Sequence, residues 1–124
     1  MMFLCSVSII ASATDYYVSS SGNDSANGLS SSNPWQSISK VNSVFPGLNP
    51  GDRILFKRGD LFYGSLKITR SGSLGSPITI TSYGTGSNPV ISGFTTVTGW
   101  NSYGNGIYYK AVSCESKPNM VTVN

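Results

Sequence analysis

The stretch PGDRILFKRGDLFYGSLKITRSGSLGSPITITSYGTGSNPVISG, residues 50–93, decides the fold class. Short runs rich in β-branched and aromatic residues alternate in it with turns built from Gly, Asn, Pro and Ser, as in consecutive β-strands. We predict strands at Arg53–Lys57, Ser65–Thr69, Ile78–Ser82 and Pro89–Ser92. The chain is therefore predicted to be an all-β protein.

The spacing of these strands is regular. One residue in each strand stands twelve positions after its predecessor: Leu55, Lys67, Thr79 and Ile91. Antiparallel hairpins in a β-sandwich and successive coils of a solenoid both give such a spacing, so it leaves both architectures open. Further strands are predicted near residues 95–98, 107–112 and 120–123.

One helix is predicted before the strands, over Pro34–Phe45. Asn33 suits the N-cap and proline suits the first helical position, while Gln36 can complete a capping box. The apolar residues recur at helical spacing: Ile38, Val41 and Val44 or Phe45. Pro46-Gly47 should end this amphipathic helix, which buries one side.

The first thirteen residues, MMFLCSVSIIASA, resemble a secretory signal peptide. An apolar run is followed by small residues at Ala11 and Ala13, the A-x-A pattern of a cleavage site, and the run is too short to span a bilayer. The alternative is a buried N-terminal strand. We expect cleavage before Thr14 and an extracellular protein, in which Cys114 would be the single remaining cysteine and no intrachain disulfide could form.

Charge is low and dispersed along the chain. Charged residues make up 10% of the sequence and the net charge is +3. Nucleic-acid-binding proteins show a clustered basic patch, whereas Lys57-Arg58 is the only tight basic pair here, so we expect no nucleic-acid partner. The sequence has no histidine, which excludes a Ser-His-Asp triad, Cys-His catalysis and histidine zinc sites within these residues.

Four motifs in order carry a family resemblance: YYVSSSGNDSANG, NPWQSISKVN, PGDRILFKRGDLFYGSL and GSPITITSYGTGSNPVISG. From Tyr16 to about Gly93 the chain resembles the N-terminal region of secreted right-handed parallel β-helix proteins of the pectate-lyase-like superfamily. The resemblance implies a strand, loop and capping helix at 14–50 and the first coils of an incomplete β-helix at 51–124, which follow the signal peptide expected at 1–13. It also implies the residues that stack inward: Ile54, Phe56, Leu66, Ile68, Ile78, Ile80, Val90 and Ile91.

The same resemblance implies a polysaccharide as partner, and it leaves the chemistry open. The parent protein could be a lyase or a glycoside hydrolase, with catalytic residues, and calcium where the family uses it, beyond Asn124. The alternative is a non-catalytic cell-surface or adhesion protein. No family catalytic motif occurs in these residues, so no catalytic or metal-binding residue is assigned.

Two aromatic residues are the candidate substrate contacts, Trp100 and Tyr103. Aromatic faces suit the apolar faces of sugar rings, and both residues lie in a Gly/Asn-rich stretch expected to be a loop. The alternative is packing within strands, where aromatic residues are common. The loop Asn23–Gly28 is interpreted as an Asx-turn loop and not as a calcium site. The charged residues of 52–70 are interpreted as solvated turn and edge charges.

Overall fold

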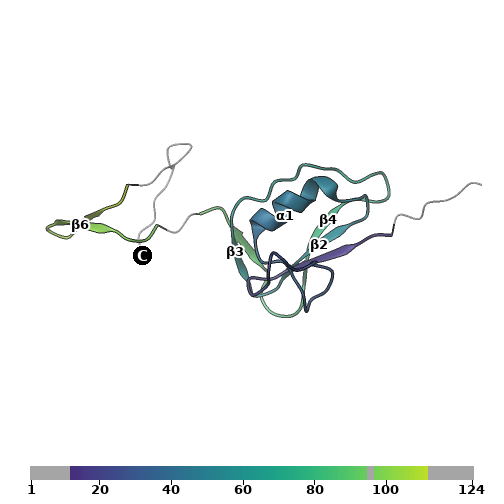
Figure 1. Cartoon of the computed structure of the whole chain (residues 1–124), viewed down its shortest axis with the longest axis horizontal. Helices are drawn as coiled ribbons and strands as arrows, with labels where there is room; N and C mark the ends of the chain where they lie inside the picture. The colour runs from purple at the N-terminus through teal and green to yellow at the C-terminus, as the bar shows by residue number, and fades with distance from the viewer. Residues whose placement is uncertain (1–11, 95–96, 112–124) are drawn as a thin grey trace, which may run out of the picture. The chain divides into compact units, whose positions relative to one another are not determined.

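The computed structural model describes residues 12–94 and 97–111, which belong to two units divided after Phe94 (Figure 1). The first unit contains β1 (Asp15–Val18), α1 (Ile38–Val44), a 3-10 turn (Phe45–Gly47), β2 (Arg53–Lys57), β3 (Leu61–Tyr63), β4 (Thr79–Tyr83) and β5 (Val90–Ser92). The second contains β6 (Asn101–Gly104) and β7 (Ile107–Tyr109). The predicted all-β class is confirmed, because strands dominate both units.

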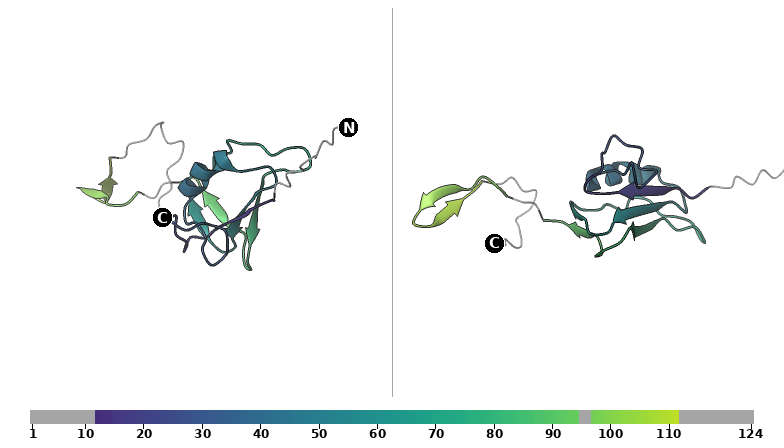
Figure 2. Two further views of the ribbon diagram at one scale, coloured as in Figure 1. Left: turned by 45° about the vertical axis from the view of Figure 1, so that its right-hand side comes forward. Right: turned by 90° about the horizontal axis from the view of Figure 1, so that it is seen from below.

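The sheets of the first unit are small and parallel. One has the order β1-β2-β4 and the other pairs β3 with β5. Tyr16, Ile54 and Ile80 occupy matching positions across the first sheet. In the right-hand view of Figure 2 these strands lie one above another, and α1 lies at the β1 end of the stack. Parallel pairing shows that the antiparallel sandwich is wrong for this unit, since hairpins would pair neighbouring strands in opposite directions.

The twelve-residue spacing does not mark paired strands. Arg53 pairs with Thr79 and Leu61 with Val90, which are 26 and 29 residues apart. The predicted strand at Ser65–Thr69 is wrong. The side chain of Asn42 on α1 accepts from the Lys67 N–H (2.8 Å) and donates to the Ser65 carbonyl (2.8 Å). This segment therefore runs beside the helix, and Leu61–Tyr63 forms the strand instead.

The helix begins four residues later than predicted. Its N-cap is Ser37, whose hydroxyl accepts from the Lys40 N–H at 3.0 Å, and not Asn33. The preceding Trp35 is hydrogen-bonded to β1 and the residue after it: its N–H donates to the Tyr17 carbonyl, and its carbonyl accepts from the Ser19 N–H. A residue bridged to a strand keeps an extended backbone, so α1 cannot start until this bridge is complete.

The core of the first unit lies between the apolar side of α1 and the inward side chains of the strands. The side chains of Phe56 and Phe62 meet edge to face at 5.0 Å, and Tyr16 stacks on Trp35 at 4.9 Å. Nine buried apolar residues form the cluster: Val18, Trp35, Ile38, Val41, Phe45, Leu48, Ile54, Phe56 and Phe62. The helical spacing predicted for Ile38, Val41 and Phe45 is therefore confirmed.

The residues expected to stack inward differ in burial from one strand to the next. Ile54 and Phe56 on β2 are buried, and Leu66 and Ile78 pack against the core. The remaining members are exposed to different degrees: Ile68, Ile80, Val90 and Ile91. The last three lie on β4 and β5, the outer strands of their sheets among the described residues, so only one side of each strand is covered. Ile68 lies in the irregular segment beside the helix.

Four further expectations concern the two ends of the chain. The expected strand at 95–98 is not formed at residues 97 and 98, and residues 95 and 96 lie outside the described residues. The strand expected at 107–112 is present as β7 (Ile107–Tyr109). The strand expected at 120–123 and residues 1–11 of the expected signal peptide also lie outside the described residues.

Candidate functional site

The two predicted sugar contacts lie in the second unit, on and beside a β-hairpin. Strands β6 and β7 pair antiparallel, with a bulge between Ser102 and Gly104. Asn105 and Gly106 join them with positive φ angles of 53° and 78°, the conformation that an Asn-Gly hairpin turn requires. The expected loop is therefore wrong for Tyr103, which is part of β6, whereas Trp100 lies in the irregular segment that immediately precedes this strand.

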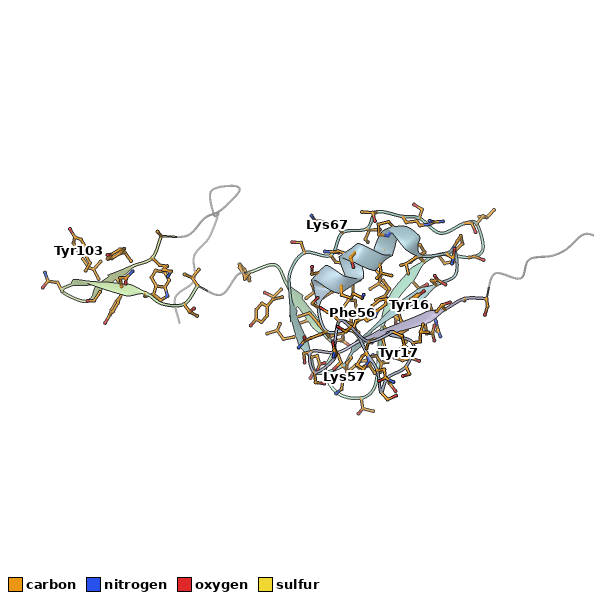
Figure 3. All side chains as sticks on the ribbon, viewed as in Figure 1. Tyr16, Tyr17, Phe56, Lys57, Lys67 and Tyr103 are labelled. Atoms are coloured by element: carbon orange, nitrogen blue, oxygen red, sulfur yellow. The ribbon has the colours of Figure 1, made fainter. Side chains whose placement is uncertain are left out.

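Both predicted residues present exposed aromatic surface. Tyr103 is 77% exposed and Trp100 is 48% exposed. The indole N–H of Trp100 donates to the Val97 carbonyl at 3.0 Å, which fixes the ring against its own chain segment. Figure 3 shows the side chain of Tyr103 on the hairpin.

The aromatic neighbour of Tyr103 is Tyr109, not Trp100. The Tyr103 and Tyr109 rings meet edge to face, with centroids 6.2 Å apart and an interplanar angle of 85°. Tyr109 was missed as a site residue because six positions separate it from Tyr103, and only the hairpin brings the two rings together. The Asn-Gly pair flanked by aromatic runs was the sequence signal that could have found it.

The charged residues of the first unit do not converge on one cleft. Lys57 and Lys67 lie on opposite sides of the unit (Figure 3). The Asp60 carboxylate accepts from the Ser19 hydroxyl (2.9 Å) and the Ser20 N–H (2.8 Å). Asp52 is fully buried, so its interpretation as a solvated charge is wrong; its carboxylate accepts from the backbone N–H groups of Thr14 and Asn49. These carboxylates hold loops in place.

The loop Asn23–Gly28 is organised by its own side chains, as predicted. The Asn23 side-chain oxygen accepts from the Ser25 N–H, and that of Asn27 from the Leu29 N–H. Within the described residues, no three His, Cys, Asp or Glu side chains gather as metal ligands would. The hydrogen bonds made by the Asn23 and Asn27 side chains are those of two Asx turns.

Asp24 points out of this loop and ties it to the start of α1. Its carboxylate accepts from the N–H groups of Gln36 (2.7 Å) and Ser37 (2.9 Å) and from the Ser37 hydroxyl (2.6 Å). Burial alone would raise the pKa of Asp24, but these hydrogen bonds and the nearby Lys40 hold it below its ordinary value. The pKa of Asp60 is likewise lowered, because its bonds from Ser19 and Ser20 outweigh its partial burial.

The concave surface of the first unit is shallow and uncharged. A groove of about 280 Å³ separates β3 from the segment that leads into α1. It is lined by Ser20, Gln36, Ser37, Ile38, Leu61, Phe62 and Tyr63. No carboxylate lines this groove, so it offers no general acid for glycoside chemistry.

Among the described residues, no helix has the length and apolar character needed to cross a membrane.

Sequence comparison connects the chain to one named enzyme. Over 78 residues it is 45% identical to a lacto-N-biosidase from Bifidobacterium longum subsp. longum. The match covers 60% of this chain and 5% of the relative, so the chain corresponds to a small part of that protein. No family model matches the chain.

Comparison of the fold points the same way. Crystal structures of GH136 lacto-N-biosidase from Eubacterium ramulus, native and selenomethionine, match with a TM-score of 0.56 and 37% identity. The match covers 61% of this chain and 12% of the Eubacterium ramulus protein. The structure of XylC in complex with xylose matches with a TM-score of 0.61 over 77% of this chain and 14% of that one, at 24% identity, which is a likeness of fold alone. The chain thus resembles part of GH136 lacto-N-biosidase in both sequence and fold.

Proposed function

We propose that this chain is part of a larger extracellular glycoside hydrolase of the lacto-N-biosidase kind, in which it forms the capped end of a parallel β-helix. The observation that carries the proposal is the 45% identity to a lacto-N-biosidase over 78 residues. The fold likeness to a second lacto-N-biosidase at 37% identity supports it independently. Both relatives are named as lacto-N-biosidases, which are hydrolases. We therefore propose hydrolysis and not the lyase reaction, which the sequence had left as an alternative.

The arrangement of the first unit supports the β-helix. Parallel strands in matching register, such as Ile54 beside Ile80 and Phe62 beside Ile91, are what successive coils would place side by side. The helix α1 and Trp35 cover the core at the β1 end. The opposite strands, β4 and β5, carry exposed Ile80 and Ile91, which a further coil of the larger protein would bury.

The proposal assigns the chain no catalytic residue. Glycoside hydrolysis uses two carboxyl groups that flank the scissile bond, one of them protonated. The described carboxylates are instead engaged in hydrogen bonds: Asp15 with Arg53, and Asp24, Asp52 and Asp60 with loop backbone groups. The proposed contribution of this chain is structural support and contact with glycan, through Trp100 and Tyr103.

The decisive experiment compares the longer protein with this chain. A chromogenic lacto-N-bioside is offered to both, and release of the chromophore is followed. We expect turnover by the longer protein and none by residues 14–124 alone. Absence of turnover by the longer protein on any glycoside, together with retained glycan binding, would favour the non-catalytic adhesion alternative. Turnover by the chain alone, lost in Asp52→Asn or Asp60→Asn, would place the active site here and contradict the proposal.

Secretion is tested separately. The apolar run that ends in Ala11 and Ala13 supports cleavage before Thr14. Mass spectrometry of exported protein should find Thr14 or a close neighbour at the N-terminus. An exported protein that retains Met1 would contradict this part of the proposal.

A further inference from the structure

The β6–β7 hairpin has two different faces. Successive side chains of a strand point to opposite faces, and residues in direct register share a face. Asn101 pairs with Tyr109, and the contact between the Tyr103 and Tyr109 rings places Tyr103 on the same side of the hairpin, although the bulge at Tyr103 interrupts the strict alternation along β6. Ser102 pairs with Tyr108 on the other face. The face of Asn101, Tyr103 and Tyr109 is called the tyrosine face below.

The tyrosine face combines aromatic surface with polar groups. Tyr103 is 77% exposed and Tyr109 is 54% exposed, and the edge-to-face contact between the rings sets them at an angle of 85°. An angled pair of rings presents one ring face and one ring edge to the same ligand. The phenol hydroxyls and the Asn101 amide supply hydrogen-bond donors and acceptors beside the rings. This combination suits a molecule with one apolar face and a polar rim.

The strands and the turn of the hairpin carry no charged side chain. From Ser71 to Tyr109 the sequence contains no Asp, Glu, Lys or Arg, so the hairpin lacks any ion-pairing group for an anionic or cationic ligand. The first charged residue after the hairpin strands is Lys110. A binding surface for uronic acids would be expected to carry Arg or Lys that pairs with their carboxylates. A neutral sugar needs only aromatic surface and hydrogen bonds.

We propose that the tyrosine face is a binding site for a neutral sugar ring, in which Tyr103 and Tyr109 form the contact surface and Asn101 hydrogen-bonds the sugar hydroxyls. The inference rests on the proposed function, since it names the ligand class and adds Tyr109 and Asn101 to the glycan contacts proposed there. Tyr108 lies on the opposite face and is a matched control for Tyr109, because both are exposed tyrosines of β7.

The test is a binding titration of the whole chain followed by NMR. Lacto-N-biose and xylose are the neutral probes, and digalacturonate is the charged comparison. In the wild-type chain we expect a neutral probe to shift the ring signals of Tyr103 and Tyr109 and to leave those of Tyr108 in place. Tyr109→Ala and Tyr103→Ala should each weaken binding about fivefold to tenfold, and Tyr108→Ala should not.

Folding of the variants is checked in the same spectra. Cross-strand contacts between Asn101 and position 109 must persist, and Tyr109→Phe, which keeps the ring, should retain most of the affinity. Equal loss in Tyr108→Ala, binding of digalacturonate as strong as that of the neutral sugars, or no shift of either ring with any neutral probe would overturn the inference. Failure of the proposed function is distinguishable, because it is scored by hydrolysis in the longer protein and not by binding to this hairpin.

Discussion

Asp24 should contribute more to the stability of the first unit than any other exposed-loop side chain. In Asp24→Ala three hydrogen bonds are lost, from the Gln36 N–H, the Ser37 N–H and the Ser37 hydroxyl. Bonds to a charged group contribute roughly 1.5–3 kcal/mol each, and partial solvent access reduces this to about 1 kcal/mol. The expected loss is therefore about 2–4 kcal/mol, or roughly 10–20 °C in Tm for a unit of this size.

The acid dependence of stability provides a second readout on the same residue. The folded-state pKa of Asp24 lies below its unfolded value, so the folded protein binds this proton less tightly. The stabilisation is fully present above the unfolded pKa, about 3.9, and is lost as pH falls through the folded pKa. The wild type should therefore lose stability more steeply than Asp24→Ala as the pH falls below about 4.

Urea unfolding of the wild type and Asp24→Ala at pH 7, 5 and 3 measures both effects. Asp15→Ala is the control, because its carboxylate meets only the exposed Arg53 side chain and should cost much less. If Asp24→Ala and Asp15→Ala unfold at the same urea concentration at pH 7, or if the gap between wild type and Asp24→Ala does not narrow at pH 3, the role given to Asp24 is refuted.

Two further substitutions test the core. Val41→Asp places an unpaired charge at a fully buried position of α1 and should lower the free energy of unfolding by several kcal/mol. Ser43→Asp, on the exposed side of the same helix, should change it little. Equal melting temperatures of the two variants would contradict the buried-helix assignment. Gly28→Ala adds a Cβ that collides with the Trp35 ring, at a φ of 73° that disfavours alanine, and should lower the Tm strongly by calorimetry. Gly47→Ala adds its Cβ in open space and should change the Tm little. A wild-type Tm for Gly28→Ala would refute the close packing of the loop.

Sequence patterns located the elements whose formation depends on neighbouring residues. The run Arg53–Lys57 is a strand as predicted, because its β-branched and aromatic residues favour extended backbone. The spacing of Ile38, Val41 and Phe45 correctly gave the buried side of the helix. The Asx turns at Asn23 and Asn27 follow from the local sequence, since each of these two side-chain hydrogen bonds spans only two residues.

The candidate site was predicted less completely. Trp100 and Tyr103 were chosen for residue type and local composition, which carry no information about what lies across a hairpin. Tyr109 is adjacent to Tyr103 only because the Asn105-Gly106 turn reverses the chain and a bulge sets the register. Their role in sugar contact remains a prediction for the binding titration.

The sequence by itself determined the all-β class, the amphipathic helix and the turns, because each follows from propensities and periodicities within a few residues. Tertiary structure alone decided the direction of pairing, since partners such as Arg53 and Thr79 are 26 residues apart and local preference is the same for parallel and antiparallel strands. It also set the start of α1. Asp24 and β1 hold Gln36, Ser37 and Trp35 in extended backbone, and hydrogen bonds from 12 or more residues away outweigh a local capping preference.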